Sequence, residues 1–208
     1  PVWYLAFPDG LTGTDGSVSS DLYRYVWAGA AAHGTRVGRV TLTRQGARLV
    51  FAWEVDGATG SEPMQMLINS ACVNGAGGSF DPSGIWFEPA RSGYGANLLV
   101  RPELDFAVLY LFDAEGRARW LLGQNAGFGS APFTLYQYSG FCPSCAAVAV
   151  SRQPAGTFTR SFDPTPAAGA EQSGRWTIGA NFAAPLIGAW SAQNAPTQLL
   201  TARKTCVQ

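Results

Sequence analysis

Four short stretches of the sequence recur in the same order in its two halves, and this internal repeat is the strongest constraint on the fold. Each matched pair shares an aromatic residue or a cysteine; the pairs are residues 3–5 with 120–122, 22–25 with 135–138, 53–57 with 176–179, and 63–73 with 196–207. A fixed order of matches is the signature of a repeated structural unit. We therefore expect a truncated first repeat at residues 1–73, a Gly-rich linker at 74–83 and a complete second repeat at 84–208.

The residue pattern predicts that each repeat is built from short antiparallel β-strands. The chain contains 25 glycines, 13 prolines and 12% aromatic residues, which favours strands joined by tight turns over helices. Apolar and polar side chains alternate along residues 48–55, whereas residues 106–112 are apolar on both faces. We expect an all-β fold with about five strands in the first repeat and about eight in the second. This antiparallel meander would form a barrel of the lipocalin or avidin type, or a two-sheet sandwich.

The charge content argues against nucleic-acid and membrane partners. Lys and Arg total 14, Asp and Glu also total 14, and only 13% of residues are charged, against roughly 25% in an average protein. The basic residues are scattered, whereas a nucleic-acid-binding surface clusters them. No apolar stretch reaches the roughly 18 residues that a membrane helix needs. We expect a globular protein with no nucleic-acid partner and no membrane insertion.

The amino-terminal segment supports two further expectations. Residues 1–5 already have the pattern of a strand and show no secretory signal, so we expect a trimmed, mature product. If the first repeat keeps only its later strands, the edge formed by Val2–Phe7 lacks a partner strand, and such edges promote aggregation. We expect a protein partner or a larger assembly to cover this edge; strands of the second repeat or a bound upstream fragment are the alternatives.

The second repeat carries a pattern that resembles a known family. Residues 84–100 read G-I-W-F-E-P-A-R-S-G-Y-G-A-N-L-L-V, and residues 110–122 read Y-L-F-D-A-E-G-R-A-R-W-L-L. This segment resembles a repeat of secreted bacterial proteins of uncharacterised function, with the pattern G-x-W-x-x-P-x-x-S-G-x-G-x-x-L followed by Y-x-x-D-x-x-G-x-x-x-W. The resemblance extends over nearly the whole chain, although residues 153–174 are longer than the matching stretch of the first repeat. It implies β architecture and a secreted, periplasmic or extracellular location, and it supplies no catalytic residues.

The four cysteines indicate an oxidising compartment and structural disulfides. Four cysteines permit three pairings. The repeat favours a bond between Cys72 and Cys206, which occupy equivalent positions, and leaves Cys142 to pair with Cys145. The C-x-x-C spacing also occurs in redox pairs and in zinc sites, but the sequence lacks the βα context of the former and the second paired knuckle of the latter. We expect two disulfides, no metal site and no cofactor.

Residue types that usually carry catalysis are sparse. His33 is the only histidine, and no serine lies in a nucleophile motif, which argues against a Ser-His-Asp arrangement. Two carboxylate pairs, Glu54 with Asp56 and Glu88 with Asp113, would be the acid and base of a polysaccharide-active enzyme. Nothing in the sequence sets the separation within either pair, so we expect no catalytic residues.

Aromatic residues in turns are the better candidates for binding. Trp27 and Trp190 lie beside small residues in predicted loops, where an aromatic ring can stack on a sugar or anchor a protein partner. Tyr94 and Asn97, in the family pattern, are further binding candidates. We expect a non-catalytic secreted module with a binding or assembly role. The alternatives are the carboxylate enzyme and a barrel that encloses a small ligand.

Overall fold

The structure is a computed structural model that consists of antiparallel β-sheets. All pairings between its strands are antiparallel, as the sequence predicts. Within the part of the chain that the structure describes, no helix is long and apolar enough to cross a membrane. The described residues are 3–6, 16–46, 48–65, 70–75, 78–91, 93–129, 131–140, 148–164, 171–184, 186, 188–201 and 206.

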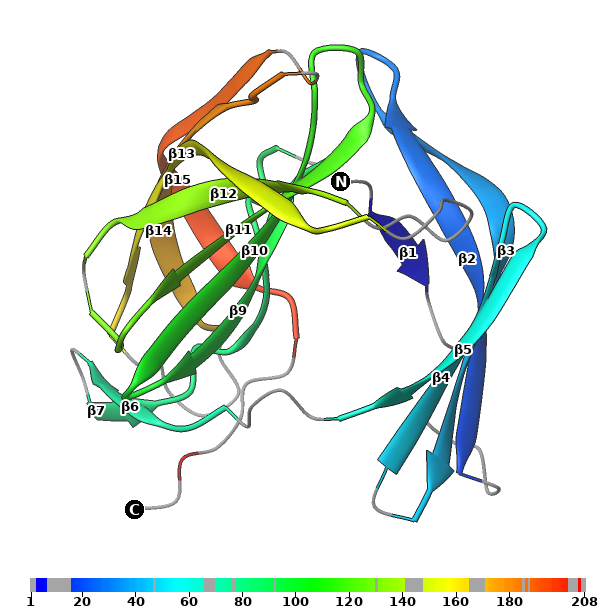
Figure 1. Cartoon of the computed structure of the whole chain (residues 1–208). Helices are drawn as coiled ribbons and strands as arrows, with labels where there is room; N and C mark the ends of the chain where they lie inside the picture. Colours follow the sequence, from blue (N-terminus) through cyan, green and yellow to red (C-terminus); the bar gives the residue numbers. More distant parts are fainter. Residues whose placement is uncertain are drawn as a thin grey trace.

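The amino-terminal part forms one open, five-stranded sheet (Figure 1). Its strands follow the chain order β1-β2-β3-β4-β5. The turn between the last two strands has positive φ angles at Asp56 (48°) and Gly57 (82°), the conformation that a two-residue hairpin turn requires. The strands are β1 (Tyr4–Ala6), β2 (Ser17–Trp27), β3 (Ala32–Gln45), β4 (Arg48–Val55) and β5 (Ala58–Met64).

The carboxy-terminal part forms a closed, eight-stranded barrel (Figure 1). Each strand pairs with its neighbours in the sequence, and β8 pairs with β15 to close the ring, with Trp86 opposite Leu199. The five and eight strands agree with the numbers expected from the sequence, and the barrel is the alternative that forms. The strands are β8 (Gly84–Phe87), β9 (Gly95–Arg101), β10 (Leu104–Phe112), β11 (Ala118–Asn125), β12 (Phe133–Ser139), β13 (Ser151–Phe162), β14 (Ser173–Asn181) and β15 (Ala189–Leu199).

Side chains fill the interior of the barrel. Along β10 every second residue points inward, and Asp105, Ala107, Leu109 and Leu111 are all fully buried. The other strands add large side chains at the same depth. They include Trp86, Leu98, Val100, Leu121, Phe133, Leu135, Phe158 and Ile178.

One ion pair lies within this interior. The Arg160 guanidinium binds the carboxylate of Asp105, and the side chains of the two residues are 3% and 0% exposed. Three phenylalanine rings surround the guanidinium, whose central carbon lies 5.7 Å from the ring centre of Phe128 and 5.0 Å from those of Phe133 and Phe162. The rings and the carboxylate replace only part of the water that the pair loses on burial, because Nε of Arg160 and Oδ1 of Asp105 are buried without a hydrogen-bond partner.

The segment predicted as a linker forms a short hairpin that packs against the barrel. It consists of β6 (Val73–Gly75) and β7 (Gly78–Phe80). Val73 and Phe80 are 4% and 5% exposed and belong to the barrel core, where Phe80 contacts Phe162. Only the glycine-rich tip has the composition of a free connection. The apolar residues on either side of the tip, Val73 and Phe80, are buried, so the hairpin packs against the second unit.

The disulfide between Cys72 and Cys206 is present, as expected from their equivalent positions in the repeat. Their Cα atoms lie 5.9 Å apart, and the bond joins residues that are 134 positions apart in the sequence. It fixes the chain entering the β6–β7 hairpin to the segment that follows β15. The expected bond between Cys142 and Cys145 lies outside the described residues.

Candidate functional site

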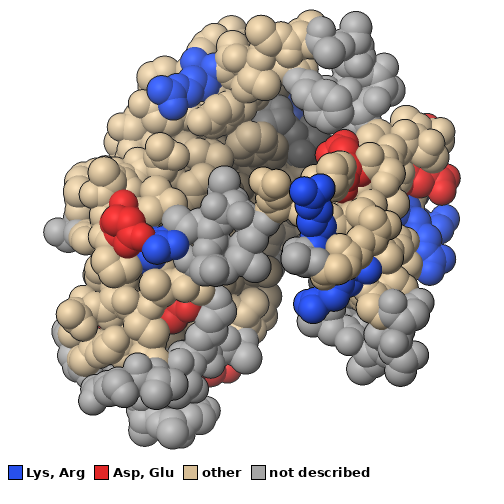
Figure 2. Space-filling model, turned by 60° about the horizontal axis from the view of Figure 1, so that its bottom comes forward, with Lys and Arg blue, Asp and Glu red and all other residues tan. Residues whose placement is uncertain are grey.

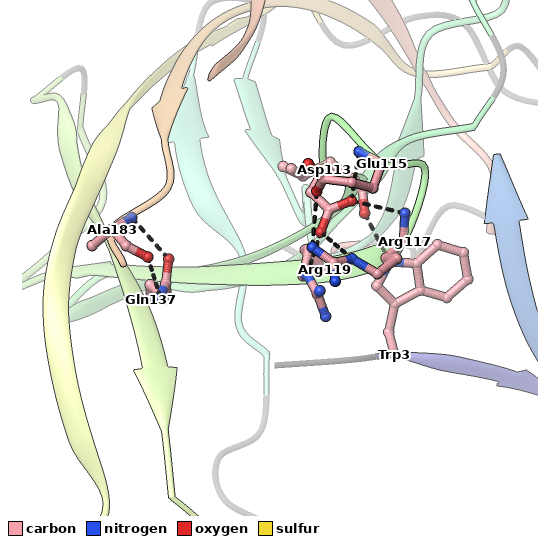
Figure 3. Close-up of polar contacts among 8 residues, drawn as sticks. Trp3, Asp113, Glu115, Arg117, Arg119, Gln137 and Ala183 are labelled. Atoms are coloured by element: carbon pink, nitrogen blue, oxygen red, sulfur yellow. Dashed lines mark hydrogen bonds and ion pairs between the residues drawn. The ribbon is translucent and has the colours of Figure 1, made fainter. Parts of the chain in front are cut away.

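The five-stranded sheet touches the barrel at the hairpin that joins β10 to β11. Val26 forms an isolated antiparallel bridge with Arg117, and the Trp27 amide donates to the Gly116 carbonyl at 2.7 Å. The Trp3 indole donates to the Leu111 carbonyl at 3.2 Å. Figure 3 shows Trp3 extending from β1 toward this hairpin. Trp3, just before β1, and Trp27, at the end of β2, therefore both contact the β10–β11 hairpin.

Two glycines of the barrel make room for Trp27. A Cβ atom at Gly93 would lie 2.7 Å from the Trp27 ring, and one at Gly116 would lie 2.1 Å from the Trp27 carbonyl oxygen. Both glycines also have positive φ angles, 92° and 74°, which side chains disfavour. The S-G-Y-G and D-A-E-G stretches of the sequence therefore shape the surface that receives Trp27.

A pocket of about 220 Å³ opens where the two sheets meet. One wall comes from the end of β2, and the others come from the β8–β9 loop, the end of β10 and the start of β15. Four of its residues are aromatic. We call it the junction pocket; its lining residues are Trp27, Arg91, Gly93, Tyr94, Phe112, Asp113 and Trp190.

Tyr94 lines the junction pocket, and hydrogen bonds hold its buried side chain in place. Its hydroxyl donates to the Glu88 carboxylate and accepts a hydrogen bond of 3.0 Å from the Trp176 indole. Burial, together with the hydrogen bond to Glu88, raises the pKa of Tyr94 above its usual value. The Trp190 ring centre lies 4.4 Å from that of Tyr94. Tyr94 therefore stays neutral and offers a rigid aromatic surface.

Arg91 stacks on this aromatic surface and is exposed to solvent. Its guanidinium carbon lies 4.7 Å from the Trp190 ring centre and 5.4 Å from that of Tyr94. One nitrogen donates to the Ser191 carbonyl at 3.0 Å. The structure shows no ion pair of Arg91 with an acidic residue in the described part of the chain. A guanidinium has five N–H donors, so several remain for a ligand.

Asp113 lines the junction pocket, but its carboxylate is fully engaged (Figure 3). It accepts four hydrogen bonds: from the Glu115 amide at 3.1 Å, from the amide and Nε of Arg117 at 2.9 and 3.0 Å, and from Nε of Arg119 at 2.9 Å. Burial would raise the pKa of Asp113, but these hydrogen bonds outweigh it and lower the pKa. Asp113 thus stabilises the hairpin turn as an anion and is no free acid.

Three of the four binding residues predicted from the sequence meet in the junction pocket. Trp27, Tyr94 and Trp190 line it together, although they come from different sheets. Asn97 does not, because it lies exposed in the middle of β9, opposite Ile85 on one neighbouring strand. Arg91 also lines the pocket and is a residue that no pattern marked. The feature of the sequence that could have marked Arg91 is an arginine between Pro89 and Gly93, in a predicted loop of a chain in which few residues are charged.

The other carboxylates considered for catalysis do not line the junction pocket. Glu54 and Asp56 are exposed at the β4–β5 turn, where Asp56 forms an ion pair with Arg24. Glu88 binds the Tyr94 hydroxyl. His33 is exposed on β3.

Searches of protein-family models, of curated proteins and of solved structures find no match to this chain. The geometry of the junction pocket is therefore the basis for assigning a function.

Proposed function

We propose that this protein is a non-catalytic binding module of the cell exterior and that the junction pocket holds one sugar ring of a glycan. The proposal rests on one observation: Trp27, Trp190 and Arg91 line the same pocket, and the guanidinium of Arg91 stacks on the Trp190 ring. The pocket volume of about 220 Å³ is below the roughly 300–1,000 Å³ of typical small-molecule sites. It suits a single ring of a longer chain.

The chemistry of the walls matches the two faces of a sugar. A pyranose presents C–H groups on its flat side, which pack on aromatic rings such as the half-buried Trp27 and Trp190. Its rim presents hydroxyl groups, which accept hydrogen bonds from the free donors of Arg91. Tyr94 and Asp113 are held by other residues and keep the walls in place.

The location outside the cytoplasm is part of the same proposal. The Cys72–Cys206 disulfide supports it, because such bonds persist in oxidising compartments and are rare in the cytosol. The resemblance to a secreted bacterial repeat supports it from the sequence.

The alternative functions receive less support. In a polysaccharide-active enzyme, one carboxylate of a pair must give up a proton and the other must act on the substrate or on water. Asp113 is fully hydrogen-bonded by the turn, and Glu88 is bound to Tyr94. A barrel that encloses a small ligand needs interior space, and here large apolar side chains fill the interior.

A glycan array followed by titration of the best glycan tests the proposal. We expect Trp190→Ala and Arg91→Ala each to weaken binding at least about tenfold, or about 1.4 kcal/mol. Trp120→Ala is the matched control, because Trp120 is also half-buried but stacks on Tyr138 outside the pocket, with ring centres 5.5 Å apart. The control should bind like the parent chain.

Two results would refute the proposal. One is equal loss of binding in the Trp120 and Trp190 variants, which would show a general effect of removing an indole. The other is hydrolysis of the bound glycan that disappears on changing Glu88 or Asp113 to its amide, which would make the protein an enzyme.

A further inference from the structure

The five-stranded sheet lacks a hydrophobic core of its own. Among its described residues, Leu22 and Val55 are the only buried apolar side chains, with 7% and 9% of their surface exposed. Neither belongs to the large core cluster, whose members come from the β6–β7 hairpin and the barrel. A sheet normally buries one face against another layer to be stable.

One face of this sheet is nevertheless apolar across three strands. Val18 lies opposite Leu42, which lies opposite Phe51, and residues that face each other across strands share one side of a sheet. In the next row on that side, Val40 lies opposite Trp53. We call this side the apolar face; its members are Val18, Leu22, Val40, Leu42, Phe51, Trp53 and Val55.

Among the described residues, neither β1 nor β5 has a second partner strand. In the described part of the chain, β1 pairs only with β2 and β5 pairs only with β4. At the β5 edge, Leu49 and its partner Met64 are 42% and 44% exposed. In the space-filling view a deep notch separates the lower part of the sheet from the barrel (Figure 2). Among the described residues, the barrel bridges this sheet only at Val26 of β2, beyond the end of β1, and it pairs with neither β1 nor β5.

The barrel contains five strands that resemble this sheet in order and in detail. β11 to β15 follow one another as β1 to β5 do. The β2–β3 pairing has a bulge between Leu22 and Tyr23, and the β12–β13 pairing has one between the matching residues Leu135 and Tyr136. A stacked Trp–Tyr pair also recurs at matched positions: Trp3 with Tyr25, and Trp120 with Tyr138, with ring centres 5.9 and 5.5 Å apart.

In the barrel, the remaining arc between β15 and β11 consists of β8, β9 and β10. β8 pairs with β15, β10 pairs with β11, and the three strands pair with one another. Their inward side chains close the core, among them Trp86, Leu98, Leu109 and Leu111. The five-stranded sheet has the matching gap between β5 and β1.

We propose that the five-stranded sheet is part of a second barrel, completed by a three-stranded polypeptide segment built like β8–β10. That segment would pair with β5 on one side and with β1 on the other, and its inward side chains would cover the apolar face. The partner is thus an extended chain with the alternation of residues 84–112 and the Gly-x-Trp and Gly-x-Gly pattern of that stretch. Strand addition of this kind uses main-chain hydrogen bonds for affinity and alternate side chains for specificity.

A second copy of part of this chain can serve as the three-stranded segment in a test of the proposal. In the aligned repeats, Trp120 matches Trp3, so residue 117 precedes the position that matches Pro1. A second copy of residues 81–117, placed directly before Pro1 of the whole chain, would supply the three strands with their natural connection to β1. The control is the same extension carrying Asn at the positions of Leu98, Leu109 and Leu111, which keeps the backbone and removes the inward apolar groups.

Hydrogen exchange with mass spectrometry measures whether the edges become paired. We expect amides of β5 to exchange at least about tenfold more slowly in the extended chain than in the parent chain. Trp53 should become less accessible to acrylamide, as read from the difference between the chain and its Trp53→Phe variant. The control extension should give neither effect.

Three results would overturn the proposal. The first is unchanged exchange of β5 in the extended chain. The second is equal protection by the control extension, because the apolar face would then not be what the segment covers. The third is a dimer of the parent chain in which β5 and Trp53 are already protected, because the face would then bind a second copy of this chain.

Discussion

Replacing Arg160 by methionine would leave the carboxylate of Asp105 alone inside the barrel. The guanidinium is its hydrogen-bond partner, and both side chains are almost completely buried. Methionine retains contact with Phe133 and Phe162 through its flexible chain, so the change removes the charge more than the packing. Removing one partner of a buried ion pair costs about 3–5 kcal/mol of unfolding free energy.

The loss of unfolding free energy in Arg160→Met should depend on pH, and the pKa of Asp105 determines whether the loss grows or shrinks as pH rises. Burial raises the pKa of Asp105 above its usual value, although Arg160 acts to lower it. A carboxyl whose pKa is raised on folding stabilises the native state below its ordinary pKa of about 4, and this contribution is lost as pH rises through the folded value. Without Arg160 the pKa of Asp105 rises further. Arg160→Met should therefore lose less stability at about pH 4 than at about pH 7.

Urea unfolding of the parent chain and the variants measures this effect. The double variant Asp105→Leu with Arg160→Met replaces the pair by apolar groups and should recover most of the lost stability, because no lone charge remains buried. A loss of less than about 1 kcal/mol for Arg160→Met at about pH 7 would refute the reasoning. A double variant whose loss equals the sum of the two single losses would refute it as well, since the two groups would then be uncoupled.

Three further changes test other parts of the structure. Gly93→Ala should lower the unfolding free energy by about 1–3 kcal/mol because its Cβ meets the Trp27 ring at a positive φ, and adding Trp27→Ala should reduce that loss in urea titrations. The double change Cys72→Ser and Cys206→Ser should cost about 2–5 kcal/mol, seen as a lower melting temperature without reductant. Burial acts to raise the pKa of Asp113, but the hydrogen bonds to its carboxylate outweigh burial and lower the pKa. The ionised carboxylate therefore stabilises the fold above about pH 4, and this stability is lost as pH falls through the lower pKa of the folded state. Asp113→Asn should lack this acid-sensitive component in unfolding midpoints measured between about pH 2 and 7.

The strands themselves were predictable because the information that forms them is local. Alternation along residues 48–55 places Phe51, Trp53 and Val55 on one side, and the structure has them on the same face. The structure also explains why residues 106–112 are apolar on both faces. Leu109 points into the barrel core, whereas Phe112 on the other face packs against Trp3.

The repeat was the only feature of the sequence that predicted the Cys72–Cys206 bond. Equivalent positions in two repeats need not lie close together, so the sequence did not show that the two cysteines meet. The structure does so because the β6–β7 hairpin packs against the same end of the barrel as the segment after β15. The composition of residues 74–83 indicated a free linker. In the structure Phe80, within this segment, is buried against Phe162, because removing an apolar ring from water is favourable.

Local residue patterns were enough to predict short antiparallel strands, their approximate number in each part of the chain, and which faces are apolar. Tertiary structure alone decided that one set of strands closes into a barrel while the other stays open, because closure depends on pairing between β8 and β15, from opposite ends of the unit. It alone placed Trp27 beside Trp190 and Arg91. The physical reason is range: alternation and turn propensity act between neighbours in the chain, whereas a closed ring and a shared pocket depend on the register of strands that are distant in sequence.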